Sequence, residues 1–361
     1  MPKERDATFD ILKGLGMVGV ICGHFSNKTM PFVYTFHMPL FFLVAGYFFT
    51  ARGFLTTLKK DISRLVVPFM LTCLVLIVLG AMEAIAKGDS VMRAIIGGIG
   101  SMIFPNGMEH PAVTGITGFS IGGLILWFLL ALFWCKTVYN LLSKYLSTNA
   151  LLIVSLGVSL AAIYIDTEVM KMPLGILPGL GAVIFFAIGK FIKENREKNG
   201  KMLAIFLGIC LVIWLRFIIF EHEKNIEMYH NEYNFYPHDV VAAIGGTFAM
   251  WLLSKFALKR VSFVGDFLTF FGANSLLIIC LHTIDHDHSL LRVFGIRAGG
   301  LHLLLAFPMY AFATVLLYKW EWARRIFGIR PYKLTTEERK ENVGKSSVEI
   351  PSLSEDSDMG R

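Results

Sequence analysis

Long apolar runs dominate this 361-residue chain, and they constrain its fold more than any other feature. A helix needs about 20 mostly apolar residues to cross a bilayer. Ten segments approach that length: 8–26, 33–51, 65–85, 120–142, 149–166, 173–190, 202–220, 237–257, 266–284 and 299–320. We therefore expect an all-α, polytopic integral membrane protein with about ten transmembrane helices.

The composition excludes several other classes of protein. Hydrophobic residues make up 55% of the chain and charged residues 17%, with a mean hydropathy of +0.60, whereas soluble domains average roughly 25% charged residues. A disordered protein and an ordinary cytosolic enzyme are excluded. The five cysteines all lie in apolar runs and none is in a CxxC pair, so we expect buried free thiols. The net charge of +7 is spread over short loops, which argues against nucleic acid as a partner.

The loops between the apolar runs indicate the orientation of the chain. One alternate set of loops holds 21 lysines and arginines, and the other set holds 7. Positively charged loops stay on the cytoplasmic side of a membrane. Both termini are therefore expected in the cytoplasm, in a multi-pass protein of the cell membrane.

We expect one membrane-embedded domain over residues 1–334. Residues 335–361 are polar and Ser-rich, and they predict a disordered cytoplasmic tail. The apolar stretch 91–104 is short and rich in Gly, so it predicts a re-entrant or interfacial segment. No repeat relates the two halves of the chain.

The first apolar segment carries ionisable groups, which are costly inside a bilayer. Lys13 and His24 are eleven residues apart, which in a helix gives one face and a rise of about 16.5 Å. Asp10 precedes Lys13 by one turn and can pair with it. The same helix offers small residues for close approach by a backbone or a slender ligand: Gly16, Gly19 and Gly23. Alternatively, Lys13 snorkels to the interface and His24 is an ordinary interfacial histidine.

Two further histidines are expected near the outer leaflet. Given the predicted orientation, His37 in the second span and His282 in the ninth lie at the depth of His24. Histidine is the side chain best suited to moving a proton near neutral pH. Convergence of the three on one site is a hypothesis, since depth alone does not bring them together.

The same histidines raise the alternative of a metal site. Three histidines can bind zinc, and the segment 282–288 (HTIDHDH), read as a loop, adds further ligands. Its spacing matches no zinc motif known to us, and no metal is expected. The outer segment 221–239 is rich in Tyr, Asn, Glu and His, a mixture typical of carbohydrate sites and of ordinary loops alike.

Basic residues precede the third span on the predicted cytoplasmic side. Lys60 and Arg64 lie just before the segment LVVPF. They are either simple orientation signals or ligands for the phosphates of a nucleotide-bearing donor.

Several blocks resemble the membrane-bound acyltransferase-3 family, in particular its fucose 4-O-acetylase-like branch. The first helix resembles that of the family in the spacing from Lys13 to His24. The segment 36–49 (FHMPLFFLVAGYFF) resembles the second-helix signature, although Ala45 stands where many members have Ser. Further matching positions are Arg64, Pro68, Trp127, Phe128, Gly272, Asn274, Ser275 and His282. The resemblance covers about residues 5–320, and ten helices is the usual number in the family.

The resemblance implies transfer of an acyl group, commonly acetyl from acetyl-CoA, to a hydroxyl of a cell-surface or exported glycan. Acetyl-CoA would be a donor substrate, and no permanently bound cofactor is implied. Lys13, Lys60 and Arg64 would hold the CoA phosphates, and the pantetheine arm would thread along the glycine-lined face. His24 would be the general base or a transient acyl carrier. His37 and His282 would be the other two catalytic residues, which orient His24 or hydrogen-bond the thioester oxygen. The supporting residues would be Asp10, which holds Lys13, and Asn274 and Ser275.

Other functions fit the apolar spans as well. A transporter or flippase for a glycan or lipid-linked sugar is the main alternative, and a sensor with a structural membrane domain is another. Neither accounts for the matching blocks. The acceptor, the identity of the acyl group and the oligomeric state, a homodimer included, are left open by the sequence.

Overall fold

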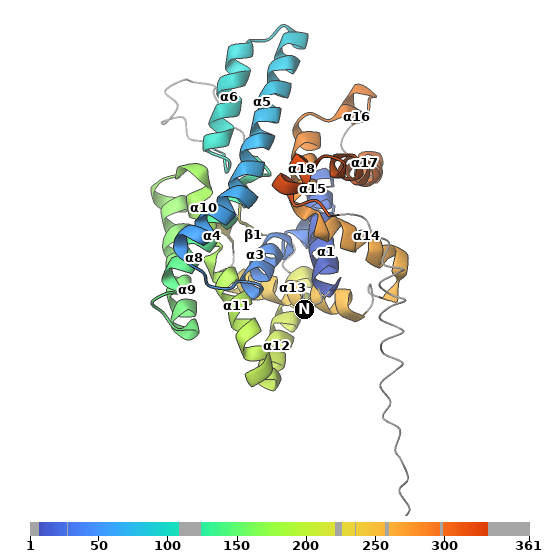
Figure 1. Cartoon of the computed structure of the whole chain (residues 1–361). Helices are drawn as coiled ribbons and strands as arrows, with labels where there is room; N and C mark the ends of the chain where they lie inside the picture. Colours follow the sequence, from blue (N-terminus) through green and yellow to red (C-terminus); the bar gives the residue numbers. More distant parts are fainter. Residues whose placement is uncertain are drawn as a thin grey trace, which may run out of the picture. The chain divides into compact units, whose positions relative to one another are not determined.

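The computed structural model describes residues 7–330, apart from 27, 108–123, 221–225, 235, 257–259 and 297–298. These residues belong to one compact unit that ends at Arg330 and is nearly all helical (Figure 1). The predicted tail and its boundary at 334 lie outside the described residues. The α-helices are α1 (Ala7–Phe25), α2 (Met30–Val33), α3 (His37–Tyr47), α4 (Phe54–Asp61), α5 (Val67–Lys87), α6 (Val91–Ile103), α8 (Trp127–Leu142), α9 (Thr148–Tyr164), α10 (Ile176–Gly181), α11 (Val183–Lys198), α12 (Gly200–Phe220), α13 (His238–Phe256), α14 (Ser262–Ala273), α15 (Ser275–Asp287), α16 (Leu290–Val293), α17 (Gly300–Tyr318) and α18 (Glu321–Phe327).

Shorter elements connect these helices. Two π-helical turns are η1 (Ile62–Val66) and η2 (Ile165–Val169), and a 3₁₀ turn is η3 (Pro173–Gly175). Strands β1 (Ile226–Glu227) and β2 (Glu232–Tyr233) form an antiparallel hairpin in which Glu227 lies opposite Glu232.

Seven continuous helical segments of the described chain are long and apolar enough to cross a bilayer, and two bent pairs raise the number to nine if each is one span. Each of the ten predicted segments overlaps a helix. The segment predicted over 120–142 is shorter than expected, because α8 has 16 residues and 120–123 lie outside the described chain. The total of ten and the cytoplasmic location of both termini stay predictions.

The segment 91–104 forms helix α6, which packs against α5 as an antiparallel hairpin (Figure 1). Ser90 caps α6 by accepting a hydrogen bond from the Arg93 amide. Gly98 allows the close approach, since a Cβ there would lie 2.6 Å from the Ile77 side chain. The structure thus gives a 13-residue helix, which is too short to span the bilayer alone.

The third span begins earlier than predicted and contains a π-helical turn. Helices α4, η1 and α5 run continuously from Phe54 to Lys87. Pro68 has no N–H to donate to the carbonyl of Arg64, and the helix widens to the π form at that point. This turn carries Arg64 at the basic end of the span.

Helix α1 packs most closely against α14, through glycines on both helices. A Cβ on Gly272 would lie 1.8 Å from the Asp10 carbonyl oxygen, and one on Gly14 would lie 2.1 Å from the Leu268 carbonyl oxygen. Neither position therefore accommodates a side chain without displacement of a backbone. This contact places the first turns of α1 beside the bend between α14 and α15.

The glycine face predicted for a ligand is occupied by protein. A Cβ on Gly16 would lie 2.9 Å from the ring of Phe41, and one on Gly19 would lie 3.4 Å from the Cβ of His37. The expectation of a ligand path along these glycines is therefore wrong. Helices α2 and α3 fill that face, and a path has to follow another face of α1.

The ninth predicted span is sharply bent. Helices α14 and α15 meet at Asn274 with an angle of 83°. The Asn274 side chain donates to the Phe270 carbonyl and accepts from the Arg330 amide, each within 3.0 Å. These bonds stabilise the bend, which directs α15 toward the C-terminal end of α1.

Candidate active site

A cavity of about 290 Å³, here called the histidine cavity, lies beside the C-terminal part of α1. Its titratable lining residues are His24, His37, His286, Tyr34, Tyr229 and Glu227. They come from α1, α3, α15, the α2–α3 turn and the hairpin. The outer segment that resembles a carbohydrate site in composition therefore contributes directly to the wall of this cavity.

The structure brings His24 and His282 together. Their ring centroids are 5.4 Å apart, and the ring of His286 lies 5.5 Å from that of His24. His282 is fully buried behind His24 and does not line the cavity. His37 lines the cavity and donates from Nδ1 to the Val33 carbonyl at 2.8 Å, which leaves Nε2 as the acceptor in the neutral ring.

A buried network missed by the sequence reasoning lies behind His282. The Tyr310 hydroxyl donates to Asp285 Oδ2 at 2.6 Å and lies 3.2 Å from His282 Nδ1. Since that hydroxyl proton is directed to the carboxylate, His282 Nδ1 is the donor to the Tyr310 oxygen. Asp285 also accepts from His302 Nε2 at 2.8 Å and from the Ser289 hydroxyl at 2.7 Å. All of these side chains are buried.

The segment 282–288 is therefore not a solvated loop. Residues through Asp287 continue α15, and Asp285 is only 5% exposed. The polar side chains of the segment face different surroundings, since His288 Nδ1 bonds Glu83 Oε2 at 2.9 Å while His282 and Asp285 face inward. Helical periodicity, which the loop interpretation ignored, accounts for this division.

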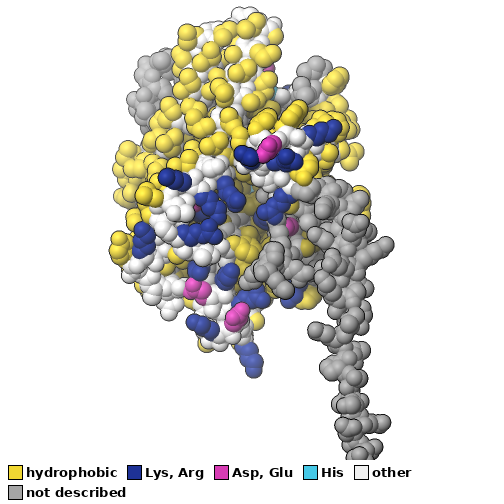
Figure 2. Space-filling view, viewed as in Figure 1, with side chains coloured by type: hydrophobic (Ala, Val, Ile, Leu, Met, Phe, Trp, Pro, Cys, Tyr) yellow, Lys and Arg dark blue, Asp and Glu magenta, His cyan; other side chains and the backbone are white. Residues whose placement is uncertain are grey.

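A larger cavity of about 950 Å³, here called the basic cavity, lies at the opposite end of α1. Its cationic lining residues are Lys13, Arg64, Lys136, Lys193, Arg196 and Arg330. Asp10 and Glu197 are its acidic residues, so the lining is positive on balance. Figure 2 shows Lys and Arg side chains gathered over the middle and lower part of one face, below the apolar surface of the α5–α6 hairpin.

Most of the predicted donor-binding residues line the basic cavity. Lys13 pairs with Asp10 at 2.8 Å, as the one-turn spacing predicts, and Arg64 and Ser275 also line the wall. Lys60 is exposed and is not a lining residue, although its charge interacts with that of Arg64. Asn274, in contrast, does not line the basic cavity, because its side chain bonds backbone groups at the helix bend.

Ile279 of α15 lines both cavities. On α1, Lys13 and Met17 line the basic cavity, and Val20 and His24 line the histidine cavity. Steps of four, three and four residues place these four side chains along one face of the helix. Lys13 and His24 thus lie on a common face, and that face joins the two cavities.

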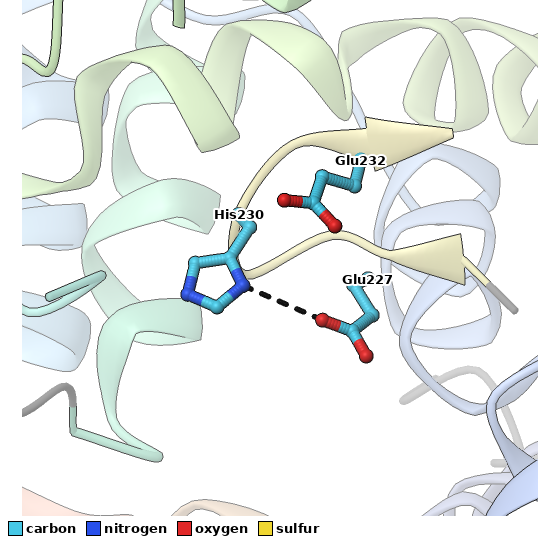
Figure 3. Close-up of side chains that lie close together, drawn as sticks. All are labelled: Glu227, His230 and Glu232. Atoms are coloured by element: carbon cyan, nitrogen blue, oxygen red, sulfur yellow. Dashed lines mark hydrogen bonds and ion pairs between the residues drawn. The ribbon is translucent and has the colours of Figure 1, made fainter. Parts of the chain in front are cut away.

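One group of side chains in the described part of the chain could hold a metal ion, and it is not the histidine group. Glu227, His230 and Glu232 of the hairpin each offer a ligand atom within 4.8 Å of the others (Figure 3). His230 Nδ1 lies 3.4 Å from Glu227 Oε2. Glu227 lines the histidine cavity, so this group lies at its rim.

A comparison with known protein families matches residues 6–319 to the acyltransferase-3 family, described as an acyltransferase domain. No curated protein and no solved structure matches the chain. The match covers the first helix, the histidine cavity, the basic cavity apart from Arg330, and the buried network behind His282. The chain therefore belongs to the acyltransferase-3 family and is a membrane acyltransferase.

Proposed function

We propose that this protein transfers an acetyl group from acetyl-CoA to a hydroxyl of a sugar in a cell-surface or exported glycan. The observation that carries the proposal is that Ile279 lines both cavities and that one face of α1 runs from the basic cavity to the histidine cavity. A basic cavity at one end suits an anionic donor, and a histidine cavity at the other end suits proton transfer to and from an acceptor.

The basic cavity fits the phosphates of CoA. Arg and Lys are the natural partners of phosphate groups, and Arg64 of η1 and Lys13 of α1 both line this cavity. Asp10 holds the Lys13 ammonium in place. Lys60, outside the cavity, adds positive potential for the part of the donor that projects from it. The thioester arm then extends past Met17 and Ile279 toward His24.

His24 acts as the general base. One ring nitrogen accepts the proton of the acceptor hydroxyl while the hydroxyl oxygen forms a bond to the thioester carbonyl carbon. The carbon–sulfur bond then breaks, and the CoA thiolate takes the proton back from His24. This sequence needs no acyl-histidine intermediate, which remains the alternative that a trapping experiment distinguishes.

His282 positions His24. Because Nδ1 of His282 donates to Tyr310, its Nε2 carries a lone pair, and this atom has no hydrogen-bond partner within the described residues. The 5.4 Å ring separation leaves room for an N–H···N hydrogen bond from His24. Such a bond holds the opposite nitrogen of His24 unprotonated toward the cavity. Asp285, which is linked to His282 through the Tyr310 hydroxyl, stabilises positive charge that develops on His24 and His282.

The acceptor side of the histidine cavity is suited to a sugar. Tyr34, Tyr229 and Glu227 supply ring faces and hydrogen-bonding groups. His37 Nε2, left as an acceptor by the Nδ1 bond to Val33, can bind a neighbouring hydroxyl of the sugar, while the reacting hydroxyl donates its proton to His24.

The direct test is incubation of purified protein with acetyl-labelled acetyl-CoA and candidate glycans, followed by mass analysis of both products. We expect the label on a sugar hydroxyl and free CoA in equal amount. Label that stays on CoA while glycan crosses a vesicle membrane would support the transporter alternative. Surface glycans from cells with and without the protein would identify the acceptor.

A further inference from the structure

A third cavity, of about 330 Å³, lies between α1, α3, α11, α12 and α13. Its inner wall is apolar, formed by side chains such as Leu12, Leu207, Ile244 and Phe248. A cavity of this size is within the range of small-molecule sites. We call it the apolar cavity, and neither the donor nor the acceptor of the proposed reaction uses it.

Cations gather where the apolar cavity opens. Arg196 and Lys255 line its mouth, and together with Arg260 they line an adjoining cavity of about 370 Å³. All three are exposed, and no Asp or Glu lines either cavity in the described part of the chain. The Lys255 ammonium lies 4.9 Å from the ring of Trp251, a cation–π contact that holds it at the mouth. All three cations lie in the set of segments that carries the predicted cytoplasmic excess of charge: Arg196 near the end of α11, Lys255 in the last turn of α13 and Arg260 after it.

An apolar cavity with a cationic mouth matches one class of molecule in its chemistry. Its occupant has a hydrocarbon chain and an anionic head group, because a free nucleotide or sugar phosphate would leave polar groups unpaired in the cavity. Anionic lipids of the cytoplasmic leaflet are attracted to Lys and Arg side chains that lie near the membrane surface. We propose that a phospholipid with a net negative, phosphate-bearing head group binds here, with a chain in the apolar cavity and its phosphate between Lys255 and Arg260.

This lipid would also act on the donor site. The apolar and basic cavities share Phe9, Val44, Tyr47 and Arg196 as a common wall. Arg196 donates a 2.5 Å hydrogen bond to the Tyr47 hydroxyl within that wall. A lipid phosphate near Arg196 would therefore alter donor affinity. This consequence rests on the proposed function, whereas lipid binding itself does not.

Binding is tested by native mass spectrometry of the purified full chain with phosphatidylglycerol or phosphatidylcholine of identical chains. We expect phosphatidylglycerol to bind at least about ten-fold more tightly, and the double variant Lys255→Gln/Arg260→Gln to lose about that factor. The matched control is Lys144→Gln/Arg324→Gln. It removes two other cations that lie over aromatic rings and line none of these cavities. Equal binding of the two lipids, or equal loss in the control, would overturn the proposal.

The apolar half of the site needs its own variant. Ala204 is exposed on α12 and lines the apolar cavity, so Ala204→Phe fills the cavity without repacking the core. We expect it to weaken lipid binding several-fold. If glycerol 3-phosphate binds as tightly as the lipid, or if Ala204→Phe binds the lipid at full affinity, the hydrocarbon chain does not contribute to binding. Either result would contradict the lipid proposal and identify the site as one for free phosphate. A separate measurement of the KM for acetyl-CoA, with and without phosphatidylglycerol, tests whether bound lipid alters donor affinity through the common wall.

Discussion

The Tyr310 hydroxyl joins Asp285 to His282: it donates to Asp285 Oδ2 at 2.6 Å and lies 3.2 Å from His282 Nδ1. Because the phenol proton is directed to the carboxylate, the proton of His282 is on Nδ1. One hydroxyl therefore sets the tautomer of the histidine that adjoins His24. In the proposed mechanism, Asp285, Tyr310 and His282 together keep one ring nitrogen of His24 unprotonated for the acceptor hydroxyl.

Tyr310→Phe removes this hydroxyl and keeps the ring. We expect kcat for acyl transfer to fall about ten-fold with little change in the donor KM, since a lost hydrogen bond to a charged group costs about 1.5 kcal/mol or more. In a His282→Ala background the same substitution should cost almost nothing further, because the two residues act as one unit. Additive losses in the double variant would mean that Tyr310 acts only through packing.

His24→Ala should abolish transfer, with a loss of at least about 10²-fold, while the protein stays in the membrane at its normal level. His24→Gln distinguishes base from hydrogen-bond donor, since an amide binds the hydroxyl and cannot take its proton. The comparison variant is His37→Ala, whose loss should be smaller and expressed mainly in acceptor KM. An active His24→Gln protein would remove the proposed base.

Arg64 and Lys60 offer a matched pair on either side of the cavity boundary. Arg64 lines the basic cavity and Lys60 is exposed beside it. We expect Arg64→Gln to raise the KM for acetyl-CoA about ten-fold, and Lys60→Gln to raise it less and only at low salt. Steady-state kinetics at two ionic strengths measure both. The reverse order would place the phosphates over α4 instead of in the cavity.

The glycine contact between α1 and α14 is a stability prediction. A Cβ on Gly272 would lie 1.8 Å from the Asp10 carbonyl oxygen, so Gly272→Ala should cost about 1–3 kcal/mol of stability and displace Asp10. Gly208 has nothing within 4 Å of an added Cβ, and Gly208→Ala should be neutral or slightly stabilising. Thermal inactivation in one detergent compares them. Equal half-lives of the Gly272→Ala and Gly208→Ala proteins would show that the close contact between α1 and α14 does not contribute to stability.

The sequence predicts the first helix well because its signals are local. The Asp10–Lys13 pair and the common face of Lys13 and His24 follow from helix geometry over one element. The role of Gly16 and Gly19 could not be predicted from the sequence, because a small residue allows the close approach of a helix as readily as that of a ligand. Only the packing of α2 and α3 decides between them.

The buried network could not be assembled from the sequence. His302 and Tyr310 lie in a run that predicts a span, and Asp285 lies in a polar stretch that reads as a loop. Their contacts join residues 17 and 25 positions apart and depend on how α15 and α17 pack. One signal was present: an ionisable His302 inside a predicted span marks a functional position.

Ile279 lines both cavities, and the proposed path for the thioester passes this side chain. Ile279→Trp should block the junction and reduce kcat at least about ten-fold while acetyl-CoA binding, measured by calorimetry, stays within about two-fold of the original. Ile279→Val keeps the passage open and should retain most activity. Leu276→Trp is the control for bulk alone, because Leu276 lines only the basic cavity and its enlargement should weaken donor binding as well. Full activity in Ile279→Trp would mean that the donor reaches His24 by a route that avoids α15, and the link between the two cavities would lose its functional meaning.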